Sequence, residues 1–138
     1  DLDAAAGALR IGGHARRTLA VPGAVLASAP AASADPAAPL LKDASGAALS
    51  TADIESMVAC AALDAGLSAA ATVTADALRH TCIAWLVRQG LRFSDLAGMV
   101  GRPSAEALAF YAELAPDGPK RGAAEVEWPM PALRETGV

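Results

Sequence analysis

"ALRHTCIAWLVRQG", residues 77–90, is the stretch that decides the fold. Its apolar side chains recur with a spacing of about 3.6 residues, which predicts a helix with one apolar side. That side is made by Leu78, Cys82, Ile83, Trp85 and Leu86. Arg79 points into this apolar arc or along its edge, although a guanidinium stays charged at physiological pH. The helix therefore needs a partner for a charge that leans toward its own core.

The composition predicts one domain with a modest core. The chain has 138 residues, of which 54% are hydrophobic but only 4% are aromatic, and alanine supplies much of the hydrophobic fraction. Because alanine buries little area, we expect the few large apolar side chains to form the core. No apolar run reaches the roughly 18 residues of a transmembrane helix, so we expect no membrane partner.

The start of the chain and its cysteines bear on where the protein works. Asp1 is followed by neither the basic start nor the apolar core of a signal peptide. Since residue 1 is not Met, we expect a fragment or a processed product. Cys60 and Cys82 fall among apolar neighbours, so we expect reduced core residues in a cytoplasmic protein. No Cys/His spacing suits zinc and no glycine-rich loop resembles a phosphate cradle, so we expect no metal and no cofactor.

The remaining sequence predicts a mainly α protein with a small antiparallel β-hairpin, an α+β class. Residues 8–21 are typical of a hairpin whose connection opens at Gly12-Gly13. The Ala-, Pro- and Ser-rich segment that follows predicts a flexible connection with a short helix at "GAVLAS". In a capped helix over 51–64, the inward stripe is predicted to be Ile54, Met57, Val58 and Ala61. Thr74 and Gly90 bound the opening helix, and further helices are predicted at 94–100, 104–114 and 121–127.

Several pieces of the sequence stand in an order that resembles the tyrosine recombinase (phage integrase) family. "TADALRHTCIAWLVRQG" and then "FSDLAGMVGRPSAEALAFYAELAP" are similar to the family's "HxLRHTxxxxLxxxG" and "LxxLLGHxxxxTTxxYxHL". Upstream, "DLDAAAGALRI", "RRTLAVP" and "PLLKDASGAALS" resemble the family's hairpin and the segment after it. The resemblance covers about residues 1–116, with 74–115 its specific part. It implies an integrase-like catalytic domain that lacks its N-terminal portion, and a tail over 117–138 that docks in cis or in trans.

The resemblance implies DNA recombination or integration, the activity of phage-like mobile elements. In this family a tyrosine attacks a phosphate of double-stranded DNA, and a free 5′-hydroxyl later reverses the phosphotyrosyl link. Such chemistry needs guanidinium groups on the phosphate oxygens and a general acid for the departing oxygen. By the match of motifs, Tyr111 is the nucleophile and Arg79 is a phosphate-binding arginine. Self-association on DNA is implied as well.

The chain departs from the family at its acid–base positions. Asp76 stands where the first motif has histidine, and an ionised carboxylate there repels a phosphodiester. Three residues before Arg79, it is also placed to pair with that arginine. Arg102 stands where the family has histidine or tryptophan, and it can hold a phosphate oxygen but makes a poor proton shuttle. The family's first arginine would lie upstream of residue 1.

The hairpin turn offers His14, Arg16 and Arg17 where the family has a lysine as general acid. His14 is the candidate acid, and the two arginines are candidate DNA contacts. His80 corresponds to a residue that supports the DNA-binding site. The net charge of −4 argues against a general nucleic-acid-binding protein. If the chain binds DNA as the resemblance implies, we expect a local positive cluster on one face, with the carboxylates elsewhere. The members of this cluster are Arg10, Arg16, Arg17, Arg79 and Arg102.

Two functions stay open, because each residue also has an ordinary structural explanation. Tyr111 fits a core stripe with Leu108 and Leu114, and Asp76 fits a first-turn acid that interacts with the helix dipole. Arg79 fits a surface arginine whose stem lies on apolar neighbours. The chain is then either a DNA breaking and rejoining enzyme or a catalytically diverged integrase-fold module that acts in DNA binding or protein assembly.

Overall fold

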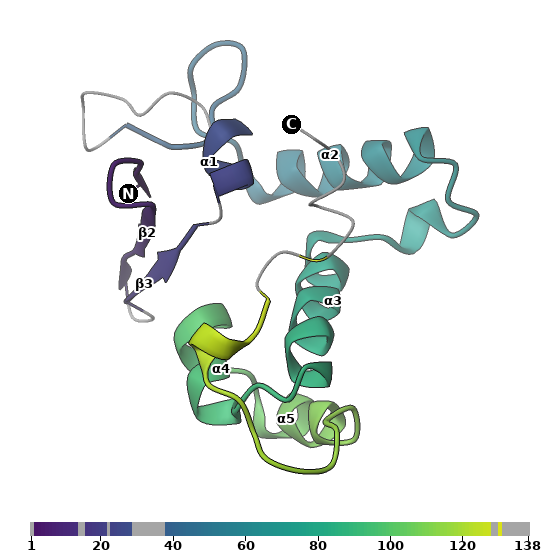
Figure 1. Cartoon of the computed structure of the whole chain (residues 1–138). Helices are drawn as coiled ribbons and strands as arrows, with labels where there is room; N and C mark the ends of the chain where they lie inside the picture. The colour runs from purple at the N-terminus through teal and green to yellow at the C-terminus, as the bar shows by residue number, and fades with distance from the viewer. Residues whose placement is uncertain (1, 14–15, 22, 29–37, 128–129, 131–138) are drawn as a thin grey trace.

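The computed structural model describes residues 2–13, 16–21, 23–28, 38–127 and 130 (Figure 1). These residues form helices and a small antiparallel sheet. In chain order the elements are β1 (Leu2–Asp3), β2 (Ala8–Ile11), β3 (Arg17–Ala20), α1 (Gly23–Ser28), α2 (Thr51–Asp64), η2 (Ala70–Thr72), α3 (Ala75–Arg88), α4 (Phe93–Val100), α5 (Ala105–Ala112) and η3 (Ala123–Glu125).

The predicted hairpin is confirmed and carries one more strand than expected. β2 and β3 pair antiparallel, with Leu9 opposite Leu19. In the described part of the chain the sheet has three strands in the order β1-β2-β3. β1 escapes prediction because it is two residues long and is returned to β2 by a turn at Gly7, whose φ is +60°. β3 contacts α4, so the sheet lies beside the helices that form the core (Figure 1).

The core lies where α3, α4 and α5 meet, in the lower part of Figure 1. Its buried side chains are Ile83, Leu86, Val87, Leu91, Leu96, Met99 and Tyr111. The helix starts follow from their caps, because the hydroxyls of Thr74 and Ser104 accept from backbone N–H groups of the first turns of α3 and α5. The predicted stop at Gly90 is confirmed by its φ of +90°. α5 ends at Ala112, short of the predicted Leu114.

Two predicted apolar stripes are wrong in part. Leu78 is 53% exposed, so the buried side of α3 begins only at the turn of Ile83. On α2 the residue that is buried is Ala62, whereas Met57 is 59% exposed. Cys60 is exposed too, so it is no core residue. On α2 the reason is its few neighbours: this alanine-rich helix contacts η2 and α3, which leaves its other sides in solvent.

The predicted flexible connection after α1 is described only from residue 38 onward, and residues 29–37 lie outside the described residues. Where it is described, it forms a tight turn. Asp43 accepts backbone hydrogen bonds from Ser45 and Ala47, and Lys42 bridges to Ala48. A short polar side chain that bonds the backbone two residues on is a common way to hold such a turn.

The segment after α5 returns to α3 and α4. Arg121 forms a parallel bridge with Leu91, and its backbone N–H donates to Gly90 O at 2.8 Å. Further on, Trp85 Nε1 and Gln89 Nε2 both donate to Glu127 O, at 3.1 and 3.0 Å. The helix predicted over 121–127 is only a single 3₁₀ turn, η3. Most of the predicted tail past this point lies outside the described residues.

No helix among the described ranges has the length and apolar character needed to span a bilayer.

Candidate functional site

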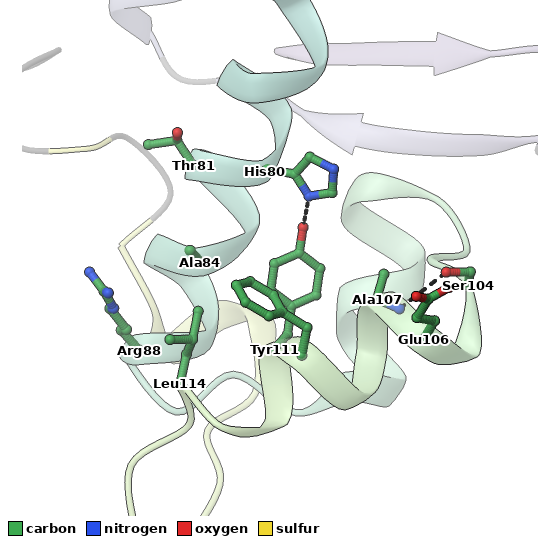
Figure 2. A pocket seen from close by; sticks show the side chains of 10 residues that line it. His80, Thr81, Ala84, Arg88, Ser104, Glu106, Ala107, Tyr111 and Leu114 are labelled. Carbon is green, nitrogen blue, oxygen red and sulfur yellow. Dashed lines mark hydrogen bonds between the residues drawn. The ribbon is translucent and has the colours of Figure 1, made fainter. Parts of the chain in front are cut away.

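The contact between α3 and α5 brings His80 to Tyr111 (Figure 2). Nδ1 of His80 and the Tyr111 hydroxyl share a hydrogen bond. The two rings lie with their centroids 5.8 Å apart. Tyr111 occupies the inward face of α5 and is 1% exposed, whereas the His80 side chain remains half-exposed. The imidazole therefore stands between the buried phenol and solvent.

The other nitrogen of the same imidazole faces Asp76. The distance from His80 Nε2 to Asp76 Oδ2 is 3.3 Å, one helical turn apart on α3. From the sequence we expect Asp76 to pair with Arg79 instead. This expectation is wrong. The Asp76 carboxylate faces the His80 imidazole, and the Arg79 guanidinium turns away toward α4. A carboxylate, an imidazole and a phenol thus form one connected row.

Arg79 finds its partner on the next helix. Its Nη2 donates to Val100 O at 2.8 Å, at the C-terminal end of α4. A helix C-terminus carries unsatisfied carbonyls and a partial negative charge, so a guanidinium is stabilised there. Of the two predicted placements of Arg79, the one inside the apolar arc is wrong, since the residue is exposed and spans from α3 to α4.

Arg17 reaches the same link between α4 and α5 from the sheet. Gly101 has a φ of +84°, and a Cβ built on it would lie 3.4 Å from Arg17 Nη1. The guanidinium of Arg17 therefore packs on the backbone next to Val100, the acceptor of Arg79. Arg102 follows directly and is exposed. Three of the predicted arginines thus belong to one neighbourhood, although they come from three separate segments.

The remaining hairpin candidates are placed less closely. Arg16 is exposed just before β3. His14, the candidate general acid, lies outside the described residues. Arg10, expected in the same positive cluster, donates from Nη2 to Asp3 Oδ2 at 3.2 Å within the sheet. Its charge is therefore partly offset by a carboxylate.

The surroundings of Tyr111 favour its neutral form. Burial is the main cause and raises the pKa of the phenol above its ordinary value near 10. The charge of Asp76 raises this pKa further, and the charge of Arg79 opposes both effects. Arg79 and Asp76 are therefore close enough to act on the phenol electrostatically. At neutral pH the Tyr111 hydroxyl keeps its proton.

A hollow of about 750 Å³ opens beside the phenol, between α3 and α5. His80 and Tyr111 line one part of it, and Arg88 and Glu106 line others (Figure 2). Phe110, next to Tyr111, lines it too and is 61% exposed. The hollow gives a small molecule a route to the edge of the site at His80.

Sequence reasoning missed the hydrogen bond between His80 and Tyr111. One signal was present, because Asp76 and His80 are four residues apart on a predicted helix, a spacing that brings side chains together. Within the described residues, no three His, Cys, Asp or Glu side chains are placed to hold a metal ion. The arrangement is suited to moving a proton between an oxygen and an imidazole.

No protein-family model matches the chain, and no curated protein or solved structure matches it significantly. A function is therefore inferred from the side chains and their geometry.

Proposed function

We propose that the protein breaks and rejoins double-stranded DNA through a phosphotyrosyl link at Tyr111, with an integrase-like catalytic fold. One observation carries the proposal. The Tyr111 hydroxyl is hydrogen-bonded to His80, 31 positions away in the chain, and it feels the charge of Arg79. These residues come from the two segments that resemble the family. A nucleophile, a proton acceptor and a fixed positive charge are what transfer of a phosphoryl group to a phenol requires.

Arg79 and Arg102 hold the scissile phosphate in this proposal. The acceptor of Arg79 is now a neutral carbonyl, Val100 O. A phosphate oxygen is charged and therefore a stronger acceptor for a guanidinium. Arg17 lies beside the same link and adds positive charge to this face. Local positive charge of this kind supports DNA binding even in a chain whose net charge is −4. His14 is the candidate general acid for the departing 5′-oxygen.

The burial of Tyr111 sets a condition on this function. A side chain that is 1% exposed does not reach a phosphate in a duplex. The proposal therefore requires the link between α4 and α5 to move aside when DNA binds, so that a phosphate reaches the hydroxyl while the bond between His80 and Tyr111 is kept. Gly101, in a backbone conformation that most residues disfavour, stands at the start of the link to α5 and is suited to absorb such a shift.

Trapping of a covalent complex tests the proposal. The full chain is mixed with a pool of random-sequence duplexes that carry a 5′-bridging phosphorothiolate, whose thiol leaving group does not reverse the attack. We expect a protein–DNA adduct that survives denaturation and maps to Tyr111. Tyr111→Phe should lose the adduct and keep DNA binding. If duplexes of the pool are bound and none becomes linked to the protein, the enzymatic proposal is wrong.

A catalytically diverged module is the second candidate. It is favoured by Asp76 at the position of the family's histidine and by the burial of Tyr111. On this alternative the protein binds DNA or assembles with other chains, and the Tyr111 hydroxyl serves packing alone. Unchanged DNA binding in Tyr111→Phe, together with no cleavage of any duplex, supports it.

A further inference from the structure

We propose that His80 accepts the proton of Tyr111 during attack on the phosphate, and that Asp76 holds the imidazole in the orientation and tautomer this transfer needs. The proposal rests on the proposed function for its substrate, a DNA phosphodiester. It assigns a use to the aspartate that departs from the family motif. His80 becomes a catalytic residue, and Asp76 becomes a positioning residue that acts through it.

The geometry fixes the direction of the transfer. When Nε2 of His80 carries the hydrogen, it donates to Asp76 Oδ2 across 3.3 Å. Nδ1 then has a free lone pair, and this is the nitrogen that meets the Tyr111 hydroxyl. A carboxylate on one imidazole nitrogen and a hydroxyl nucleophile on the other is the arrangement by which hydrolases activate serine. Here the nucleophile is a phenol.

The surroundings explain why a proton acceptor is needed. Burial keeps the phenol protonated, and a neutral phenol is a weak nucleophile. Two charges of opposite sign, those of Asp76 and Arg79, lie on the same helix as His80 and act on the phenol in opposite directions. Arg88 of α3 and Glu106 of α5 line the hollow beside His80. Arg17 of β3 and Arg102 stand at the link between α4 and α5.

The Tyr111 proton moves to His80 Nδ1 as the phenol oxygen forms its bond to phosphorus. The bond from phosphorus to the 5′-oxygen breaks, and that oxygen takes a proton from the separate general acid of the proposed function. In the rejoining step a 5′-hydroxyl gives its proton back to that acid and attacks phosphorus. The bond to Tyr111 breaks, and the phenolate recovers its proton from His80.

A small phosphorylating probe tests the relay without DNA. Tyr111 is the one tyrosine in the sequence, so a modified tyrosine is unambiguous in a mass spectrum. Diisopropyl fluorophosphate is the probe: the phenol oxygen bonds to phosphorus, fluoride leaves, and the proton goes to His80. The rate of modification is measured on the full chain against pH. We expect the wild-type rate to level off well below pH 10, where free phenols ionise.

Two variants separate the relay from simple electrostatics. His80→Gln keeps a hydrogen-bonding side chain without a basic nitrogen, and we expect modification at least about tenfold slower, with the rise moved to the phenol range. Asp76→Asn removes a charge that disfavours the phenolate, so electrostatics alone predicts faster modification. The relay predicts slower modification by several-fold. Asp64→Asn, an exposed carboxylate at the end of α2, is the matched control and should change nothing.

Each result decides the matter. A wild-type Tyr111 that does not react, an Asp76→Asn variant that reacts faster, or a His80→Gln variant with the wild-type profile overturns the relay. Because the probe needs no DNA, an intact relay without any DNA adduct would overturn the proposed function alone. DNA adducts that form equally well in His80→Gln would overturn the relay alone. Circular dichroism confirms that each variant is folded.

Discussion

His80 and Tyr111 are hydrogen-bonded to each other across the contact between α3 and α5. The bond satisfies the polar end of a tyrosine that is otherwise enclosed in the core, as buried tyrosines generally require. It also joins a residue at the half-exposed edge of α3 to a tyrosine ring that is only 1% exposed. The same contact therefore serves the stability of the core and the chemistry proposed for the site.

The ionisation of Tyr111 is the first measurable consequence. Absorbance of the phenolate reports one group, since the chain has one tyrosine. We expect a pKa above the ordinary value of about 10. Arg79→Gln removes a charge that lowers this pKa and should raise it further. Asp76→Asn removes a charge that raises it and should lower it. Shifts of the same sign in both variants would contradict this account.

The same pKa predicts how stability changes at alkaline pH. Because the pKa of Tyr111 is raised by folding, the folded state holds the phenol proton more tightly than the unfolded chain does. Stability from this source is complete below about pH 10 and is lost as the pH rises through the folded pKa. Denaturant unfolding of wild type and Tyr111→Phe measures it. The difference between them should change above about pH 10 in favour of the phenylalanine variant, and a constant difference would refute the prediction.

A double-mutant cycle measures the bond itself. Tyr111→Phe, His80→Ala and the double variant are unfolded with denaturant. We expect a coupling free energy of about 0.5–1.5 kcal/mol, the usual net value of a hydrogen bond. Arg88→Ala replaces His80→Ala in a control cycle, because Arg88 is on the same helix and lines the same hollow. That coupling should be near zero, and equal couplings in the two cycles would mean that the effect is not specific to His80.

Gly101 and Gly98 give a matched pair of substitutions. Gly101→Ala places a side chain at a φ of +84° and within 3.4 Å of the Arg17 guanidinium. We expect a loss of about 1–3 kcal/mol in the free energy of unfolding. Gly98→Ala lies in α4, with nothing within 4 Å of the new Cβ. It should stabilise by about 0.5–1 kcal/mol, since alanine favours helix over glycine. Thermal and denaturant unfolding check both, and a stabilising Gly101→Ala would contradict the strain.

Sequence patterns predicted the parts of the fold that local chemistry decides. Thr74 and Ser104 cap helices at the predicted places, and the hairpin pairs as expected. Sequence patterns failed to predict burial where it depends on a partner that is distant in the chain. Leu78 has the spacing of a core residue, yet nothing in the local sequence reveals that no neighbour covers it.

In the candidate site, too, local features were predictable from the sequence and contacts with other helices were not. A helix that carries Asp76 one turn before Arg79 and His80 was predictable from spacing alone. Their partners were not, since Val100 O and the Tyr111 hydroxyl come from other helices. Side-chain pairs on one helix follow from its period, whereas contacts between helices depend on how the helices pack.

The bridge between Leu91 and Arg121 has a mechanical consequence. It closes the segment that carries α4 and α5 into a loop fastened at both ends beside α3. Glu127 is fastened to α3 as well, through Trp85 and Gln89. A force that pulls on the chain after Glu127 therefore acts on α3, the longest helix of the core. It is not transmitted through α5, the short helix of Tyr111. The helix that carries Tyr111 is therefore shielded from such a load.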